Sequence, residues 1–256
     1  MTQILKDQVT IITGAGRGIG REYALRFAEE GARLVLPDIS LERADSVAQE
    51  IKAKGGEAAA MLCDIADEGA TKKMVERVTK LYGHVDILLN NAALFGGLPM
   101  QPWDSWTVEE WDRIFEINVR GTWLCCKVIA PLMIKQSKGK IINISSNIIE
   151  PAPFGAENLL PYTCSKAAVY TLTQTLARAL GPYGINVNAI APGITASEAS
   201  LEMVSKEAWD AIVARQCFTR SCKPLDLVGA AVFLASKDSD FITGQVLVVD
   251  GGVWLR

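Results

Sequence analysis

Histidine is nearly absent from this sequence: its 256 residues include one, His84, beside six cysteines. Serine–histidine and cysteine–histidine catalysis therefore have a single candidate base, and His84 precedes an apolar run, where a loop residue is the simpler interpretation. The cysteines form no Cys-x-x-Cys pair, so a zinc site would need ligands from scattered positions. We expect no metal site and interpret the cysteines as free thiols in a reducing compartment.

Long apolar runs and blocks of like charge are also missing. No stretch approaches the roughly 18 consecutive apolar residues of a membrane-spanning helix. The start, MTQILKDQ, lacks the basic segment and apolar run of a secretory signal. Lysine and arginine number 26 against 29 aspartates and glutamates, a net charge of −3. Nothing here favours nucleic acid or a membrane as a partner, and we expect a cytoplasmic protein.

Seven short runs rich in β-branched residues and leucine alternate with longer amphipathic stretches. The runs cover 9–13, 32–36, 57–62, 85–90, 140–145, 185–190 and 245–250, and the helical patterns cover 18–30, 41–54, 67–82, 107–136, 161–181 and 224–235. Most runs are apolar throughout, as in strands covered on both faces. The alternation predicts an α/β fold: a Rossmann-like, doubly wound parallel sheet of about seven strands with helices on both faces. We expect one domain over residues 1–256.

Helix ends carry recognisable signals. Thr107 and Glu110 have the spacing of a capping box. Glycines follow several helical patterns, where a left-handed residue ends a helix: Gly31, Gly55, Gly83 and Gly181.

A glycine-rich loop, TGAGRGIG (13–20), joins the first predicted strand to the first helix. We expect Gly14 to permit a sharp turn, Gly18 to let a phosphate approach the backbone, and Gly20 to allow close packing. The N-terminus of the helix then offers N–H groups to a pyrophosphate. Because position 19 is Ile19, the loop departs from Gly-x-Gly-x-x-Gly, and a simple connector is the alternative.

Asp38 ends the second predicted strand. A carboxylate there can accept both ribose hydroxyls of NAD and would repel the 2′-phosphate of NADP. Arg17 points the other way, because it could pair with that phosphate. We predict NAD, since the strand end faces the ribose directly; the alternative is that Asp38 only caps the following helix.

Further motifs follow in order: CDI (63–65), NNAA (90–93), INISS (142–146), YTCSK (162–166), APGI (191–194) and FITGQVLVVDGG (241–252). With the glycine loop they closely resemble the short-chain dehydrogenase/reductase family, from about residue 7 to the C-terminus. Within that family the chain is similar to bacterial NAD-dependent alcohol dehydrogenases that oxidise secondary aryl alcohols.

The resemblance implies a catalytic set of Asn118, Ser146, Tyr162 and Lys166. Tyr162 would be the general base, with Lys166 one helical turn away. A nearby ammonium and a positive nicotinamide both favour phenolate, so we expect the pKa of Tyr162 to fall by roughly 2–3. Ser146 would hydrogen-bond the reacting oxygen, with Ser145 as its competitor. Asn118 would support a water leading to the lysine, or be an ordinary helix residue.

The resemblance also assigns the cofactor contacts, residue by residue. Arg17, Ile19 and the loop glycines would contact the cofactor, and Lys166 would also hold the nicotinamide ribose. Asp64 and Ile65 would contact adenine; Asn91, Ala92 and Ala93 the adenosine ribose side; and Pro192, Gly193, Ile194 and Thr195 the nicotinamide amide. Small strand-end packing residues and a plain Pro–Gly turn are the simpler alternatives.

Three features depart from the family pattern. NNAA ends in Ala93 where glycine is usual, Ser197 stands where threonine is usual, and Ser146 and Tyr162 are about three residues further apart than is common. These differences affect substrate identity rather than the reaction.

We expect the pocket walls in 94–106, 147–161 and 194–218, the last as a lid. The substrate contacts would be Ser146, Ile148, Phe154, Leu160, Tyr162 and Met203. These segments are apolar and carry little cationic charge, which predicts a neutral, hydrophobic or aromatic secondary alcohol and its ketone. Trp103, Trp106 and Trp111 line this pocket or belong to the core or an oligomer interface.

The broad apolar faces of 107–136 and 161–181 and the end GGVWLR predict a homotetramer. A carbonyl or 3-oxoacyl reductase that uses NADPH is the alternative enzyme; Asp38 and the net charge weigh against it. A nucleotide-binding scaffold without turnover is the alternative outside enzymes, and the complete Ser146, Tyr162 and Lys166 set weighs against that.

Overall fold

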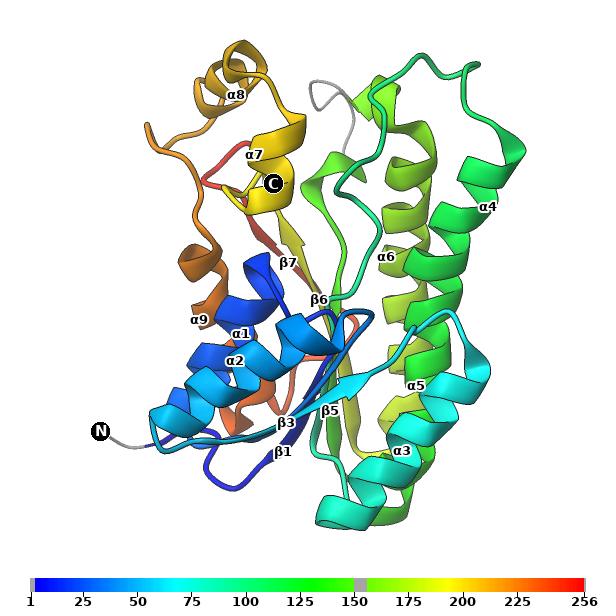
Figure 1. The fold of residues 1–256 in the computed structure, drawn as a ribbon, viewed down its shortest axis with the longest axis vertical. Coiled ribbons are helices and arrows are strands. Elements are labelled where there is room, and N and C mark those ends of the chain that lie inside the picture. The colour runs from blue at the N-terminus through cyan, green and yellow to red at the C-terminus, as the bar shows by residue number, and fades with distance from the viewer. Residues whose placement is uncertain (1–2, 150–155, 256) are drawn as a thin grey trace.

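A single parallel sheet organises the protein (Figure 1). The computed structural model describes residues 3–149 and 156–255. Within them the strands are β1 (Val9–Ile12), β2 (Arg33–Asp38), β3 (Glu57–Leu62), β4 (Ile87–Asn90), β5 (Gly139–Ile144), β6 (Ile185–Pro192) and β7 (Val246–Val249). Their order is β3-β2-β1-β4-β5-β6-β7, and every pairing is parallel. The order reverses between β1 and β4, which makes this the switch point where open α/β sheets bind ligands.

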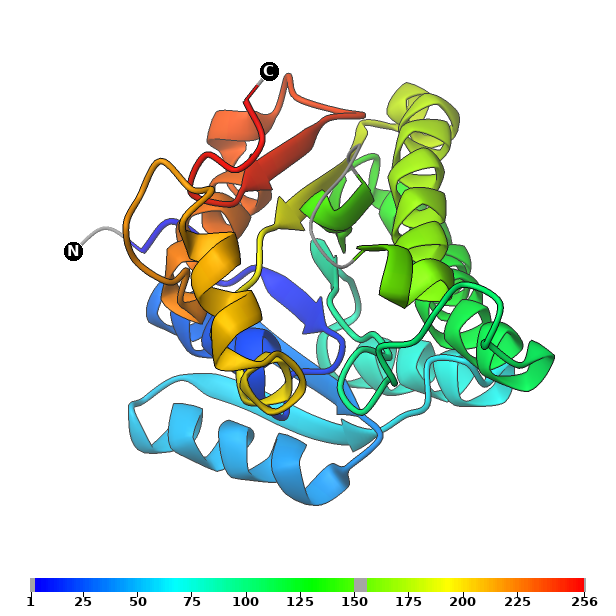
Figure 2. The same cartoon turned by 90° about the horizontal axis from the view of Figure 1, so that it is seen from above.

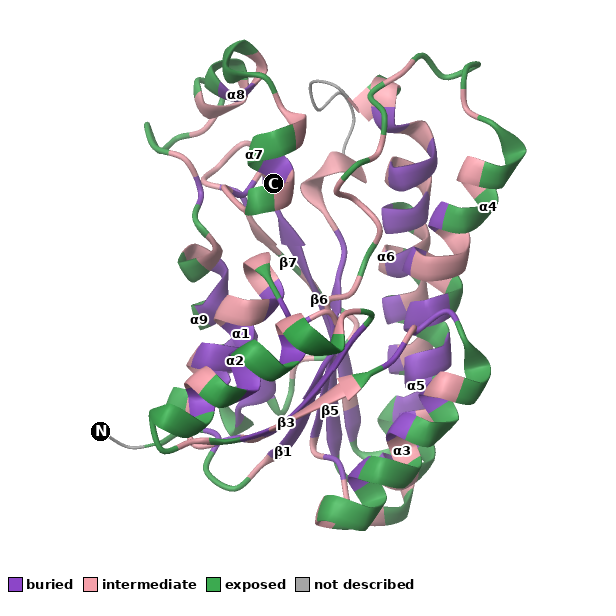
Figure 3. Ribbon diagram, in the orientation of Figure 1, coloured by how far each residue is buried: buried purple, intermediate pink, exposed green. Residues whose placement is uncertain are grey.

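Helices cover both faces of the sheet, so the predicted fold class is confirmed (Figures 1 and 2). One layer holds α1 (Gly18–Glu29), α2 (Leu41–Ala53) and α9 (Pro224–Ala235); the other holds α3 (Glu68–Tyr82), α4 (Val108–Phe115), α5 (Thr122–Gln136) and α6 (Leu160–Leu180). Successive strand residues point to opposite layers. Ile12 packs in the α1 and α9 core, whereas its neighbour Ile11 packs in the α3 and α5 core. This two-sided burial explains why most of the strands are rich in apolar residues, whereas the edge strand β3 is mostly half-buried (Figure 3).

The helix ends agree with the sequence signals except at one glycine. Thr107 and Glu110 form the predicted capping box. Gly83 ends α3 in the left-handed conformation at φ +79°. Gly181, in contrast, has a helical φ of −53°, because α6 continues into a 3-10 turn; the left-handed residue is Gly184, at φ +71°.

The long helical pattern over 107–136 is not one regular helix. A π-helical turn, Glu116–Gly121, lies between α4 and α5. The combined run Val108–Gln136 is long and apolar enough to cross a membrane by those two criteria, but half of its most apolar window is buried inside the protein. A core helix has the same composition, and α5 packs against the sheet and α6.

The expected lid contains two short helices above the carboxyl end of the sheet, α7 (Glu198–Met203) and α8 (Lys206–Val213). Each begins at a serine that accepts a hydrogen bond from a backbone N–H of the first turn: Ser197 from Ser200, and Ser205 from Ala208. These caps explain where the helices start.

Candidate active site

A cavity of about 410 Å³ lies at the switch point, between the glycine loop, the strand ends and the lid. All of the expected cofactor residues line it: Gly14, Arg17, Gly18, Ile19, Gly20, Asp38, Asp64, Ile65, Asn91, Ala92, Ala93, Tyr162, Lys166, Pro192, Gly193, Ile194 and Thr195. The parallel strands bring these residues together, because their carboxyl ends share one edge of the sheet.

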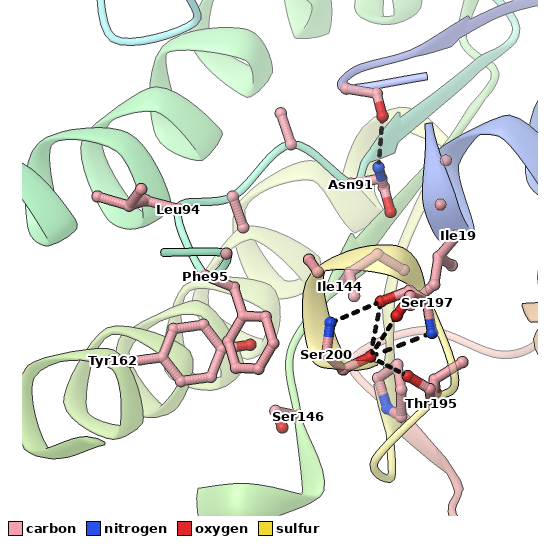
Figure 4. Close-up of a pocket in the computed structure, with 18 of the residues that line it drawn as sticks. Ile19, Asn91, Leu94, Phe95, Ile144, Ser146, Tyr162, Thr195, Ser197 and Ser200 are labelled. Atoms are coloured by element: carbon pink, nitrogen blue, oxygen red, sulfur yellow. Dashed lines mark hydrogen bonds between the residues drawn. The ribbon is translucent and has the colours of Figure 1, made fainter. Parts of the chain in front are cut away.

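The glycine loop packs too closely for side chains. A Cβ at Gly20 would lie 2.2 Å from the Gly14 carbonyl oxygen, and Gly14 itself has a left-handed φ of +66°. Asn91, labelled in Figure 4, holds the loop from β4, since its amide donates to the carbonyls of Thr13 and Gly14, each at 3.1 Å. The close approach predicted at Gly20 is therefore present.

The N-terminus of α1 faces the cavity with its N–H groups. Arg17, the residue before the helix, provides no side-chain cap, and the first turn has no acidic residue. These features fit an anionic diphosphate. The Glu198 carboxylate of α7 approaches the same place, with Oε2 3.4 Å from where a Cβ of Gly18 would stand. A diphosphate and this carboxylate would compete for the helix end.

Asp38 is 6% exposed at the end of β2. Its Oδ2 accepts from the Gly16 N–H at 2.9 Å, and its Oδ1 accepts from the Ser40 N–H at 2.9 Å. Arg43 stands 3.6 Å away. Because Ser40 is the residue that caps α2, the alternative role of Asp38 as a cap is not the one observed. The carboxylate instead joins the glycine loop to the cavity wall.

Ser146, Tyr162 and Lys166 all line the cavity. Figure 4 shows Ser146 and Tyr162 on the wall opposite Ile19. Tyr162 and Lys166 lie in the first two turns of α6, and the Lys166 Nζ is 5.6 Å from the centre of the Tyr162 ring. Nζ donates to the Ile144 carbonyl at 2.8 Å. This bond holds the ammonium between α6 and the end of β5.

The pKa of Tyr162 is shifted opposite to the expectation. Burial raises the pKa of the phenol, and its hydrogen bond with Ser146 offsets only part of that rise. Burial also lowers the pKa of Lys166 to about 8. Both shifts arise because a low-dielectric site disfavours the charged form. The chain alone therefore keeps the phenol protonated at neutral pH.

Two serines directly follow β5, and the structure distinguishes them. The Ser145 hydroxyl is buried and donates to the Lys166 carbonyl at 3.0 Å. The Ser146 hydroxyl accepts from the Ile148 N–H at 3.2 Å and lines the cavity, where its interaction with Tyr162 lowers the pKa of that phenol. Ser146 is thus the serine available to a substrate oxygen.

Asn118 does not line the cavity. It lies in the π-helical turn, 1% exposed. Its Oδ1 accepts from the Leu94 N–H at 2.7 Å, and its Nδ2 donates to the Leu94 carbonyl and to the Ser165 hydroxyl. The side chain therefore bonds the loop after β4 to α6, and it contributes to the site by holding that loop in place.

The expected substrate contacts are only partly present. Ser146, Ile148 and Tyr162 line the cavity, whereas Leu160 and Met203 do not, and Phe154 lies outside the described residues. The neighbouring Leu159 and Val204 line the cavity in their place. One position changes the direction of a side chain by about 100° on a helix, so an error of one residue reverses the assignment.

Several lining residues lie in the expected wall segments but were not singled out from the sequence: Leu94, Phe95, Asn147, Ala208, Ile212 and Arg215. Val253 also lines the cavity and lies outside those segments. The Phe95 ring packs on the Tyr162 ring with centroids 5.1 Å apart and planes tilted by 52° (Figure 4). Arg215 brings a cation that the apolar character of the lid sequence did not suggest. Phe95 had one sequence signal, its position two residues after NNAA.

The three tryptophans considered for the pocket are not among its lining residues. Trp111 stacks on Phe115 at 5.1 Å, and Trp103 is 71% exposed. Trp209 of the lid is buried and donates to the Ser221 hydroxyl at 2.8 Å, so it anchors α8.

Comparison with known proteins identifies the family. A family model described as enoyl-(acyl carrier protein) reductase matches residues 14–254. The chain is a short-chain dehydrogenase/reductase. This dehydrogenase/reductase is 39% identical over 262 residues to galactitol 2-dehydrogenase of Agrobacterium fabrum, covering 98% of this chain and 99% of the relative.

Other relatives are named for a different reaction, the reduction of 3-oxoacyl groups on an acyl carrier protein. The dehydrogenase/reductase is 34% identical to a 3-oxoacyl-[acyl-carrier-protein] reductase of Thermotoga maritima, covering 97% of this chain and 98% of the relative. A crystal structure of a 3-oxoacyl-[acyl-carrier protein] reductase with bound NAD from Brucella melitensis superposes with a TM-score of 0.89 at 29% identity, covering 100% of this chain and 94% of that one. The chain is thus an oxidoreductase whose relatives include polyol dehydrogenases and oxoacyl reductases.

Proposed function

We propose that this oxidoreductase is an NAD-dependent secondary-alcohol dehydrogenase and ketone reductase acting on neutral substrates with a hydrophobic or aromatic part. The observation that carries the proposal is the meeting of Ser146, Tyr162 and Lys166 in one cavity with the glycine loop. The cavity holds a hydrogen-bonding serine, a proton donor and acceptor, and a cation beside a place for a dinucleotide. This combination serves hydride transfer at a carbinol carbon.

In the proposed mechanism the protein moves one proton and orients one oxygen. NAD, when bound, supplies the nicotinamide carbon that accepts hydride. The Ser146 hydroxyl binds the reacting oxygen, and the Tyr162 oxygen takes the O–H proton of the alcohol as its C–H hydrogen leaves as hydride. In ketone reduction Tyr162 returns that proton. Lys166 stabilises the phenolate, and Asn118 positions the loop that bears Phe95.

The residues around the glycine loop support NAD as the cofactor. The Asp38 carboxylate is directed at the loop by the Gly16 N–H, in the region where an adenosine ribose would lie, and it disfavours an added phosphate there. Arg17 and Arg43 line the same cavity, and their positive charges would favour the additional phosphate of NADP. We favour NAD because the buried carboxylate is the more rigidly placed charge.

The substrate side supports a neutral alcohol with an apolar arm. Its walls include Leu94, Phe95, Ile148, Ile212 and Val253. The likeness to galactitol 2-dehydrogenase adds polyols to the candidates. A second function, reduction of 3-oxoacyl thioesters with NADPH, is favoured by one observation besides the relatives' names: Arg215 in the cavity wall offers a cation to an anionic carrier.

We also propose that the protein is cytoplasmic and forms a homotetramer, and that it binds neither nucleic acid nor a membrane. Exposed apolar side chains support self-association: Trp123 on α5, Phe233 on α9, Leu247 on β7 and Phe241 before β7.

The deciding experiment follows NADH formation with a panel of alkyl, aryl and polyol secondary alcohols at mildly alkaline pH. NAD⁺ and NADP⁺ are compared side by side, and an acetoacetyl thioester with NADPH tests the second function. We expect turnover with NAD⁺ and a fall of about 10²–10⁴-fold in Tyr162→Phe, which keeps the ring but not the proton carrier. Binding of NADH without turnover on any substrate would contradict the proposal and favour a scaffold.

A further inference from the structure

We propose that Asn147 determines specificity by binding a second hydroxyl group of the substrate, on the carbon next to the reacting one. Vicinal diols and longer polyols would then be preferred over simple alcohols. This inference rests on the proposed oxidation at Ser146 and Tyr162. It is argued from the position, the anchoring and the unused hydrogen-bonding capacity of the Asn147 amide.

Asn147 directly follows the serine that would hold the reacting oxygen. It begins the 3-10 turn Asn147–Ile149 and lines the cavity half-buried. Within that turn the Ile148 N–H donates to the Ser146 hydroxyl at 3.2 Å, so Ser146 and Asn147 are held in a fixed relation. Consecutive Cα atoms lie about 3.8 Å apart. Two polar groups at this spacing on one wall suit two hydroxyls on adjacent carbons.

The amide is anchored from behind by a buried carboxylate. The Asn147 Nδ2 donates to the Asp250 Oδ2 at 3.1 Å, and Asp250 is 3% exposed. Asp250 also accepts from the N–H groups of Gly252 at 2.9 Å and Trp254 at 3.0 Å. Gly193 closes the remaining side, because a Cβ there would lie 2.7 Å from the Asp250 Cβ. Asp250 is therefore a rigid positioning residue.

This anchoring fixes which way the amide faces. An ionised carboxylate only accepts hydrogen bonds, so the nitrogen of Asn147 must point toward Asp250. Among the described residues, Asp250 is the hydrogen-bond partner of this side chain. The amide has a second N–H and a carbonyl oxygen, and a hydroxyl can both donate and accept. The remaining capacity thus matches an alcohol group.

The charge behind the amide selects among polar substrates. The Asp250 carboxylate disfavours a substrate carboxylate at this wall, whereas a neutral hydroxyl meets no such penalty. Oxidation still occurs at the carbinol held by Ser146: its C–H hydrogen leaves as hydride to NAD⁺, and its O–H proton goes to Tyr162. The neighbouring hydroxyl is unchanged, so the product is an α-hydroxyketone.

The test compares alcohols that differ by one hydroxyl: 1-phenyl-1,2-ethanediol with 1-phenylethanol, and 2,3-butanediol with 2-butanol. In the full-length protein we expect kcat/KM to favour each diol. Asn147→Leu, which keeps the volume but removes the amide, should lower the ratio of diol to simple alcohol about tenfold, as expected for one lost hydrogen bond. Ile149→Ala, in the same turn but not lining the cavity, is the control and should leave the ratio unchanged.

Asp250→Asn tests the anchor, and we expect the same ratio to fall. General damage to the fold would lower kcat/KM for the diol and for the simple alcohol by the same factor, and the ratio of the two would stay unchanged. An unchanged ratio in Asn147→Leu, or an equal fall in Ile149→Ala, would overturn the inference while the proposed function stands. If neither alcohol of either pair reduced NAD⁺, the proposed function would fail, and this inference with it.

Discussion

Tyr162 and Lys166 have opposite charges when ionised, yet their shared burial makes each harder to ionise. Desolvation by burial is the largest cause of both the raised pKa of the phenol and the lowered pKa of the ammonium. A protonated phenol is the form that donates to a ketone oxygen. For the proposed reaction, we therefore expect the rate of alcohol oxidation to rise with pH as the phenol loses its proton.

The lowered pKa of Lys166 predicts a pH-dependent stability difference. A lysine in the unfolded chain holds its proton up to about pH 10, whereas Lys166 in the folded protein releases it near pH 8, because its pKa is lowered to about 8. Between these values the unfolded state binds more protons, so the contribution of Lys166 to the free energy of unfolding rises with pH. Lys166→Met, which buries no charge, should lose this rise, amounting to roughly 1–3 kcal/mol.

Urea unfolding of both proteins at pH 7 to 10 measures this effect. The difference between them isolates Lys166 from other groups, such as the Cys63 thiol, whose pKa burial raises to about 11. A difference that stays constant over this pH range would show that the folded-state pKa of Lys166 is not lowered.

At the scale of elements, the glycine loop and the start of α1 pack so closely that an added side-chain atom does not fit. A Cβ at Gly20 would lie 2.2 Å from the Gly14 carbonyl oxygen and 2.5 Å from the Asn91 Nδ2. Gly20→Ala should destabilise the fold by about 3 kcal/mol and weaken NADH binding, since the loop must move away from β4.

Gly229→Ala is the matched control for this substitution. Gly229 lies inside α9 with no atom within 4 Å of its Cβ position, apart from its own helix and neighbours. Alanine there should stabilise the helix by up to about 1 kcal/mol. Thermal unfolding and NADH titration of both variants check the pair; equal effects would refute the packing argument.

Elements with strong periodic patterns were predictable, and those set by tertiary packing were not. The strands and most helices follow from apolar runs, caps and glycines. The π-helical turn before α5 had no such signal. A Cβ at Gly121, its last residue, would lie 2.8 Å from the Ile65 side chain, and Asn118 bonds to Leu94 in the loop after β4. The lid helices α7 and α8 are too short for periodicity to indicate them.

The candidate site was predictable where ordered motifs specified it. Every expected cofactor residue lines the cavity, and Ser146 is distinguished from Ser145 as expected. Substrate contacts were less predictable, because they depend on which of two adjacent residues faces inward. Leu159 replaces Leu160 for this reason. The anchoring of Asn147 by Asp250, 103 positions away, could not be read from either local sequence.

At the scale of the whole molecule, apolar side chains remain uncovered at one edge of the sheet. β7 is the edge strand, where Leu247 is 39% exposed, and Phe241, which precedes it, is fully exposed. Uncovered apolar groups beside an unpaired strand edge favour association. Light scattering should therefore give a multiple of the 27.7 kDa chain mass.

Phe241→Asp should shift the protein toward smaller species by placing a charge in that contact. Trp103→Asp, at a similarly exposed tryptophan in a distant loop, is the control and should leave the mass unchanged. A monomeric mass for the unsubstituted protein would contradict the expected homotetramer.

The lid leaves the body of the protein and returns to it at a single point. Thr195 and Cys222 pair as a parallel bridge, and the Ala196 N–H donates to the Cys222 carbonyl at 2.8 Å. The segment is also bonded to the turn after β7, where the Cys217 N–H donates to the Gly251 carbonyl at 2.8 Å. Because both ends of the segment meet, the part before Cys217 can change in length and sequence without moving any strand. Recombination between relatives could thus exchange this segment as a cassette, so that substrate choice evolves while the hydride-transfer chemistry is inherited intact.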